Sequence, residues 1–319
     1  MSDRNLRSDI LPVLRHYTDI IMAQKFFKTI RFLKPLLFIT PAILCILMIM
    51  VYPLIKSISI SFTNRLFTYD NCLFTGFQNY ITILHDEQFW MSLVNSIKLT
   101  AISVTGSVTI GLLLALLINN KIKNINIFRG LLFIPWIMPS MVTALIYRWV
   151  YNDFYGYANY ILVKYGIIDN PVNLLADPFL AWVGLSIPVI WHYYPFVMIF
   201  FLASLQGIDK NLYDAAKIDG AGRWQSFRSV TLPALKQPIV IITILEIIWT
   251  FCAFDLVYIL TNGGPFNSTL TLSVYIYKKA FENKILGYAS AMAAIMFMIL
   301  FVITMIYFRT IWRRTVNEK

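Results

Sequence analysis

The sequence predicts an all-α integral membrane protein with six transmembrane helices. Three observations predict it: the composition, the length of the apolar runs and the placement of the basic residues. Of the 319 residues, 58% are hydrophobic and 13% are charged, whereas soluble domains carry about 25% charged residues. The three cysteines are far apart and odd in number, so they indicate neither a disulfide framework nor a metal site.

Six apolar stretches are long enough to cross a bilayer, which takes about 20 residues as a helix. Helices are expected because an open strand would leave its backbone polar groups unpaired in lipid. The expected spans are residues 36–60, 92–118, 130–150, 179–205, 238–260 and 286–308.

The N-terminal tail, residues 1–35, mixes apolar and basic side chains. This pattern predicts either an amphipathic helix on the cytoplasmic membrane surface or a poorly ordered lead into the first span. We expect no secretory signal there, because the tail holds seven basic residues and no apolar core. Pro41 and Pro53 predict a kink in the first transmembrane helix, residues 36–60. Residues 61–91 then form an external segment.

The transmembrane core is expected over residues 92–308, and residues 309–319 are expected to form a cytoplasmic tail. Within the core, the external segment 151–178 is rich in tyrosine. This composition predicts either anchoring at the lipid headgroups or a cap that meets a polar ligand or partner. The external segment 261–285 begins Thr-Asn-Gly-Gly-Pro, which predicts a sharp change of direction.

The basic residues predict the orientation. Of the 27 Lys and Arg residues, 19 fall in residues 1–35, 119–129, 206–237 and 309–319, which share one side of a six-span protein. The positive-inside rule puts this side, with both termini, in the cytoplasm. Topology and contact with membrane lipid headgroups therefore explain the formal charge of +11, and we expect no nucleic-acid partner.

The most specific segment is a hydrophilic loop between the fourth and fifth spans. Asp209 is placed to cap a short helix that starts near Lys210. Gly220 is placed to end this helix, because glycine tolerates the left-handed conformation. A second amphipathic segment follows and stops near Pro233. By spacing alone, the loop is either a docking element for a groove on another protein or an ordinary interfacial loop.

The residues of this loop carry a resemblance to a known family. The loop contains Asp214-Ala215-Ala216, then Gly220 after three residues, then Val230-x-Leu232-Pro233 after nine more. This order resembles the EAA signature of bacterial ABC importer permeases. Asp214 and Val230 stand where the family usually has Glu and often has Ile. Segments 212–222 and 261–281 resemble carbohydrate permeases of the maltose and glycerol-phosphate branch, and within it the first of two dissimilar permease subunits.

The resemblance implies a type I ABC importer permease fold with a cytoplasmic coupling helix, in the bacterial inner membrane. It implies a second permease subunit, two cytoplasmic ATP-binding subunits, an external solute-binding protein and a sugar substrate. The chain has no G-x-x-x-x-G-K-[ST] phosphate loop. We therefore expect no catalytic site and no cofactor on this chain, with ATP and Mg on the partner ATPase. Within loop 209–222, the residues expected to couple to the ATPase are Leu212, Tyr213, Asp214, Ala215, Ala216, Asp219, Gly220 and Gly222.

The resemblance also places a sugar-facing stripe on the fourth and fifth spans, at positions that match sugar contacts in the maltose permease. The expected substrate-binding residues are Val189, Tyr193, Phe196, Glu246, Trp249, Thr250 and Ala253. The side chains differ from those of that permease, so the resemblance does not name the sugar. A carboxylate accepts sugar hydroxyls but also suits an amine-bearing solute. Alternatively, Glu246 is a protonated group that hydrogen-bonds between helices.

Two other classes of protein remain as alternatives. An ion-coupled secondary transporter would use Glu246, Asp255 or His192 as a proton site, because ionisable groups inside a span are candidates for function. It would need no ATPase and would leave the loop pattern without a purpose. An intramembrane enzyme would need a Ser-His-Asp, metal or paired-carboxylate set, and no such set stands at usable spacing.

Overall fold

The structure is a computed structural model that describes residues 38–67, 72–119 and 125–317. These residues form helices and loops, with one isolated bridge between Thr63 and Phe74. The chain divides into two compact units, residues 1–59 and 60–319. The predicted amphipathic helix in residues 1–35 lies outside the described residues.

In the first unit, the described residues form the greater part of an apolar helix over Phe38–Ser61. A π-helical turn, η1 (Leu47–Val51), interrupts it before α2 (Tyr52–Ser61). Pro53 has no backbone N–H, so it cannot donate to the carbonyl four residues earlier. The widened turn ends at Val51, two residues before this proline, and the N–H of Tyr52 bonds to the carbonyl of Leu47, five residues earlier.

The second unit holds four long apolar helices and one bent pair. The long helices comprise α4 (Glu87–Ile118), α8 (Pro178–Gln206), α14 (Leu286–Asn317) and the run from Arg223 to Phe251. That run consists of α10 (Arg223–Ser226), η2 (Phe227–Thr231) and α11 (Leu232–Phe251). With the first helix, the six predicted spans are all present when the bent pair counts as one.

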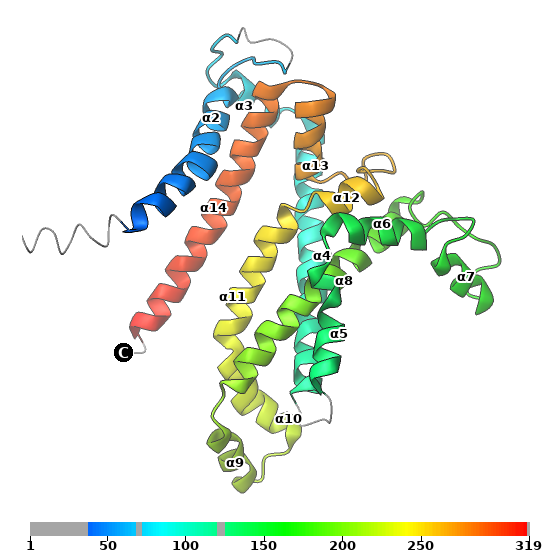
Figure 1. The fold of residues 1–319 in the computed structure, drawn as a ribbon, viewed down its shortest axis with the longest axis vertical. Coiled ribbons are helices and arrows are strands. Elements are labelled where there is room, and N and C mark those ends of the chain that lie inside the picture. Colours follow the sequence, from blue (N-terminus) through cyan, green and yellow to red (C-terminus); the bar gives the residue numbers. More distant parts are fainter. Residues whose placement is uncertain (1–37, 68–71, 120–124, 318–319) are drawn as a thin grey trace, which may run out of the picture. The chain divides into compact units, whose positions relative to one another are not determined.

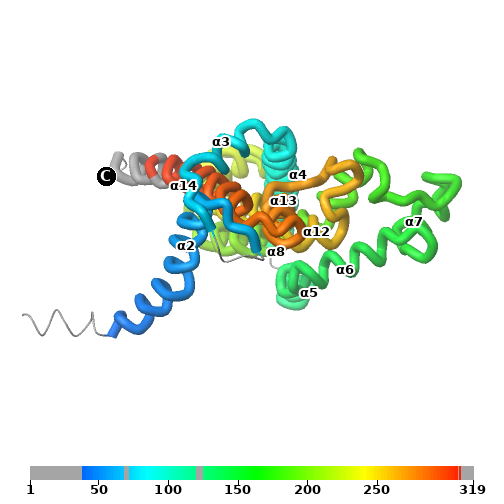
Figure 2. Tube along the Cα trace, turned by 90° about the horizontal axis from the view of Figure 1, so that it is seen from above, coloured from blue at the N-terminus to red at the C-terminus, as the bar shows by residue number. Residues whose placement is uncertain are grey.

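The third predicted span is not continuous. It comprises α5 (Ile125–Ile137) and α6 (Ser140–Val150), which meet at an angle of 93°. Pro139 lies in the break and has an extended backbone, with φ −56° and ψ 139°. A proline in this conformation neither continues a helix nor allows its predecessor to. Figure 2 shows α6 carrying the chain sideways from α5 toward α7 (Tyr157–Lys164).

The fifth predicted span, residues 238–260, is also broken, and its expected continuity is wrong. It ends as α11 at Phe251, and α12 begins at Asp255 and runs to Leu260. Between the two helices, Phe254 has φ −113° and ψ −58°, outside regular helix geometry. The break contains no glycine or proline, which are the usual helix breakers. Neither these residue types nor the apolar pattern therefore predicts it.

Side-by-side packing of α4, α5, α8 and α11 builds the centre of the second unit (Figure 1). Glycines on α4 let α8 approach closely, since a Cβ at Gly111 would lie 2.7 Å from Cγ1 of Val197. Fully buried side chains such as Leu99, Phe201 and Ile242 fill the interior. Large apolar side chains elsewhere on these helices are exposed, as expected of surfaces that face lipid.

One end of the unit is tied together by Asp86, which caps α4. Its carboxylate accepts hydrogen bonds from the hydroxyls of Tyr275 (2.6 Å) and Tyr288 (2.5 Å). Tyr275 belongs to α13 (Leu272–Tyr277), which continues into η3 (Lys278–Glu282), and α3 (Gln78–Leu84) lies against α14 near by. Burial alone raises the pKa of Asp86, but these tyrosines and two backbone N–H groups outweigh it and lower that pKa.

Candidate functional site

The hydrophilic loop forms a short helix, α9 (Lys210–Ile218), at the end of the second unit away from α13 (Figure 1). Asp209 caps it as predicted, because its carboxylate accepts the backbone N–H of Asn211 at 2.9 Å. The helix carries one ion pair, between Asp214 and Lys217 at 2.9 Å, which is exposed. An exposed pair of this kind contributes little to stability.

Gly220 ends this loop helix with a positive φ of +78°. The N–H of Gly220 bonds to the carbonyl of Lys217, and the N–H of Ala221 bonds to the carbonyl of Ala216. This pair of bonds is the Schellman motif, in which the residue with positive φ just past the helix end is usually glycine. The predicted helix stop at Gly220 is confirmed.

One hydrogen bond ties the loop helix to the following helix, and the apolar side chains of the loop helix are exposed. The hydroxyls of Tyr213 and Thr231 hydrogen-bond at 2.9 Å, which ties α9 to η2. No residue of α9 is buried, and the apolar side chains of Leu212 and Ile218 are 52% and 87% exposed. The helix is thus held in place by its cap and its tether, and it leaves these two apolar side chains largely exposed.

The remaining predicted coupling residues lie on this exposed surface. Ala216 is half-buried, and Ala215, Asp219 and Gly222 are exposed. Gly222 precedes α10 with φ −70°, an ordinary value that any residue adopts. Of the two glycines, only Gly220 therefore has a backbone that demands glycine.

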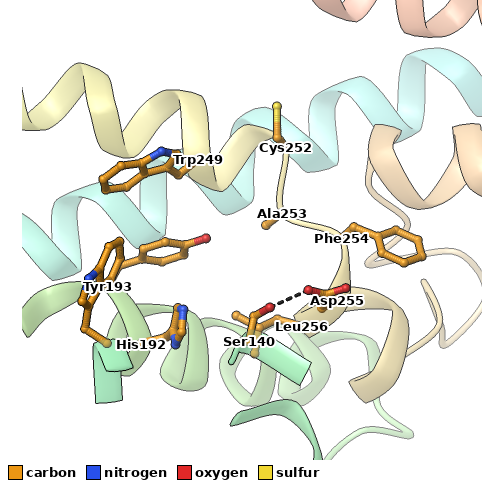
Figure 3. A pocket seen from close by; sticks show the side chains of 10 residues that line it. Ser140, His192, Tyr193, Trp249, Cys252, Ala253, Phe254, Asp255 and Leu256 are labelled. Atoms are coloured by element: carbon orange, nitrogen blue, oxygen red, sulfur yellow. Dashed lines mark hydrogen bonds between the residues drawn. The ribbon is translucent and has the colours of Figure 1, made fainter. Parts of the chain in front are cut away.

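A cavity of about 520 Å³ lies where the two broken helices meet α8. Both breaks face it: α6 begins there with Ser140, and α12 begins there with Asp255 (Figure 3). Its lining consists of Trp136, Ser140, His192, Tyr193, Trp249, Cys252, Ala253, Phe254, Asp255 and Leu256. In membrane transporters, discontinuous helices of this kind build substrate sites near the midplane.

Aromatic rings form one side of the cavity. The ring of Trp136 lies 5.9 Å from that of Tyr193 and 5.2 Å from that of Trp249, between centroids. Tyr193 and Trp249 are nearly parallel, with an interplanar angle of 16° and a separation of 6.3 Å. Phe196 packs behind them, 4.8 Å from Trp136 and 5.0 Å from Trp249. The three helices α5, α8 and α11 thus each contribute to one aromatic wall.

Polar groups form the opposite side. The Ser140 hydroxyl donates to Oδ2 of Asp255 at 2.5 Å, so the first residues of α6 and α12 are joined (Figure 3). His192 also lines the cavity, with its ring centroid 5.0 Å from that of Tyr193 and its Nδ1 3.4 Å from Oγ1 of Thr143. A mostly apolar wall with a few fixed polar groups is typical of a small-molecule site.

The structure separates the predicted substrate residues into two groups. Tyr193, Trp249 and Ala253 line the cavity, and Phe196 supports the aromatic wall. Val189, Glu246 and Thr250 are buried in the helix packing and do not line it. Contact with substrate stays a prediction for the residues of both groups.

Glu246 is fully buried, and in the described part of the chain neither of its carboxyl oxygens has a hydrogen-bond partner. The Ser107 hydroxyl of α4, which packs against α11, donates instead to the carbonyl of Ser103 at 2.6 Å. A buried polar group without a partner is costly. Among the described residues, no group of three or more His, Cys, Asp or Glu side chains is arranged to hold a metal ion.

Sequence reasoning did not assign Trp136 or Ser140 to the site, and it left Asp255 outside the expected substrate-binding residues. Pro135, near the end of α5, and Pro139, in the helix break, were the available signal for the first two. Prolines inside an apolar run indicate irregular backbone, which membrane proteins tolerate where it lines a cavity. Asp255 had a weaker signal, as an acid in a run that reads as one span.

Helices long and apolar enough to cross a membrane, two of them broken around a cavity, fit a membrane permease. The chain belongs to the family described as the binding-protein-dependent transport system inner membrane component, whose model matches residues 107–317. The resemblance read from the loop is thus confirmed. The chain is a permease of an ABC importer, and the predicted fold class is also confirmed.

Individual relatives cover most of the chain. The lactose transport system permease protein LacF of Rhizobium radiobacter is 38% identical over 77% of this chain and 83% of its own length. The sulfoquinovosyl glycerol transport system permease protein SmoG of Agrobacterium fabrum is 35% identical over 88% of this chain and 90% of its own length. In a crystal structure of a bacterial ABC transporter for import of the acidic polysaccharide alginate, one chain has a TM-score of 0.77 and 22% identity. That match covers 94% of this chain and 99% of the other, and it establishes the shared fold.

Proposed function

We propose that this permease imports a sugar or oligosaccharide and that the cavity between the two helix breaks is its binding site. The aromatic wall of Trp136, Tyr193 and Trp249 supports this, because aromatic rings pack on the apolar faces of sugar rings. The polar groups opposite suit sugar hydroxyls. The named relatives transport lactose and sulfoquinovosyl glycerol, and both are carbohydrates or their derivatives.

The rest of the importer is proposed to come from other chains. These are a second, dissimilar permease that completes the pathway, two cytoplasmic ATP-binding subunits and an external solute-binding protein. ATP and Mg are bound and hydrolysed on the ATP-binding subunits, since this chain carries no phosphate loop. This chain would then have no catalytic site of its own.

The exposed helix α9 is proposed to be the element that seats in the ATPase. Its capped ends and its bond from Tyr213 to Thr231 make it a rigid extension of α11, through η2. Movement of the ATPase would thus reach the cavity-lining end of α11 directly. This orientation puts α9 and both termini in the cytoplasm of a bacterial cell, with the importer in the inner membrane.

Uptake by the assembled importer tests this function. The importer is reconstituted in proteoliposomes, with ATP inside and the solute-binding protein outside, and uptake is measured with a panel of labelled sugars. We expect ATP-dependent uptake of at least one sugar and a loss of at least tenfold in Trp249→Ala. Uptake that a proton gradient drives without ATP would instead favour the ion-coupled alternative.

A further inference from the structure

With His192 counted as neutral, the cavity carries one formal negative charge and no positive charge on its described lining. Of the residues that line it, Asp255 is the only carboxylate, and none is a lysine or an arginine. The one basic residue on α6 and α12 is Arg148, near the C-terminal end of α6. It lines separate pockets, one of them with Tyr258 and Thr261, so its charge lies outside the cavity.

The Asp255 carboxylate is held in one orientation. Oδ2 accepts the Ser140 hydroxyl, whereas Oδ1 has no hydrogen-bond partner in the described part of the chain. The residue is half-buried and lines the open space (Figure 3). A fixed carboxylate oxygen that faces a cavity accepts hydrogen bonds and donates none.

The helix ends explain how a negative charge is kept there. Asp255 is the first residue of α12 and is bonded to the first residue of α6. The N-terminal ends of helices carry partial positive charge, which stabilises a carboxylate. The N-terminal end of α6 therefore adds partial positive charge beside the Asp255 carboxylate.

We infer that this cavity selects saccharides that offer hydrogen-bond donors at Asp255, neutral or amine-bearing, and rejects those that carry a carboxylate there. This inference rests on the proposed function and names its substrate class. An acidic sugar would bring a second negative charge against Asp255 with no cation on the described lining to receive it. Like charges at close range inside a cavity of low dielectric repel strongly, and such repulsion is a source of specificity.

The test measures binding to the purified permease–ATPase complex without the solute-binding protein, so that protein's selectivity does not enter. The probes are matched in size: lactose, its amine-bearing analogue lactosamine, and lactose with C6 of the galactose oxidised to a carboxylate. Binding is read from quenching of tryptophan fluorescence, and Trp249→Phe identifies the signal from the cavity. We expect the acidic disaccharide to bind at least tenfold more weakly than lactose.

Variants assign the effect to the carboxylate. Asp255→Asn keeps the size of the side chain and removes its charge, so the preference for lactose over the acidic sugar should fall at least tenfold. Ser140→Ala frees the carboxylate to rotate and should reduce that preference by a smaller factor. Arg148→Gln changes one charge outside the cavity and should leave the preference as it is. If lactosamine binds more tightly than lactose, and Asp255→Asn removes the difference, the carboxylate also pairs with an amine.

Two outcomes contradict the inference in distinguishable ways. Equal binding of the neutral and acidic disaccharides, unchanged in Asp255→Asn, overturns the selectivity and leaves sugar import standing. If none of the three probes quenches tryptophan fluorescence, and no sugar in the uptake panel is transported, the proposed function fails together with the inference.

Discussion

Glu246 is a buried acid that packing and hydrogen bonds within the described part of the chain do not account for. It is fully buried within a single chain, so a second subunit cannot reach its carboxyl oxygens to pair with them. Burial without a hydrogen-bond partner costs about 1–3 kcal/mol for a polar group. A residue retained at that cost is a candidate for function.

Replacing Glu246 tests whether its carboxyl group has a hidden partner. In Glu246→Met, an apolar side chain of similar length should leave the thermal stability of the assembled complex unchanged or raise it, by up to about 2 kcal/mol in unfolding free energy. Glu246→Gln keeps an unpaired polar group and should gain nothing. A Met variant that is less stable than wild type by about 2 kcal/mol or more would reveal a partner. Loss of sugar-stimulated ATP hydrolysis at wild-type stability would instead support the predicted contact with substrate.

Asp86 makes a pH-dependent contribution at the same scale. Its pKa in the folded protein is lowered, so its stabilising effect is present above the pKa of about 3.9 of an unfolded chain. That effect is lost as pH falls through the lower, folded pKa. Asp86→Asn should lower the stability by about 1–2 kcal/mol at pH 7, a modest value because the carboxylate is only partly buried.

The measurement for Asp86 is the thermal midpoint of wild type and Asp86→Asn between pH 3 and pH 8. The difference should be constant above about pH 5 and should shrink at the acidic end. Tyr275→Phe removes one of the two tyrosine donors and should show a smaller difference of the same form. A difference that does not depend on pH would mean that the asparagine disturbs packing and that the charge contributes nothing.

At the scale of helices, Gly220 is the position where the loop depends on one residue type. A β-branched residue at φ +78° is strained by about 1–3 kcal/mol, although a Cβ would meet no neighbouring atom. Gly220→Val should therefore disorder the end of α9 and weaken association with the ATPase about tenfold or more, while membrane insertion is kept. The measurement is the amount of ATPase that co-purifies with the permease, together with ATP hydrolysis.

Gly166 provides a matched control for Gly220. Its φ is +67°, and a Cβ there would also meet no neighbouring atom, but it follows α7 rather than α9. Gly166→Val therefore adds the same strain outside the coupling loop and should leave ATPase association intact. Equal loss in both variants, or no loss in Gly220→Val, would remove the coupling role from α9.

The loop could be predicted from sequence because its structure is local. Asp209 caps and Gly220 terminates within one short segment, and each acts through hydrogen bonds to backbone only a few residues away. The same holds for the apolar spans, whose lengths follow from bilayer thickness. The break at residues 252–254 is different, because the contact between Asp255 and Ser140 spans 115 residues of sequence. No local pattern encodes such a contact.

The cavity shows the same division between local and distant information. Tyr193 and Ala253 were placed on the substrate-facing stripe from the resemblance, and both line the cavity. Trp136 and Ser140 come from the broken third span, which the apolar pattern presents as one straight helix. Helical spacing alone also places Glu246 and Ala253 on one face, yet one is buried and the other lines the cavity. The break after Phe251 turns the chain between them.

At the scale of the second unit, the exposed loop and the cavity are joined by α11. This helix continues from η2, which α9 contacts through Thr231, and reaches Trp249, which lines the cavity. If α9 seats in the ATPase as proposed, binding at the cavity and seating of the ATPase would act on the same helix. This connection gives a permease without a phosphate loop a physical route to the energy of ATP.

The central claim is that sugar occupies the cavity between the helix breaks, and Cys252 tests it most directly. Cys252 is exposed and lines the cavity, and the other two cysteines, Cys45 and Cys72, are also exposed. With Cys45→Ala and Cys72→Ala in the assembled importer, the rate of maleimide alkylation at Cys252 is measured with and without a sugar that the uptake assay identifies. We predict that saturating sugar slows alkylation at least fivefold. An unchanged rate at a concentration that saturates transport would contradict the claim.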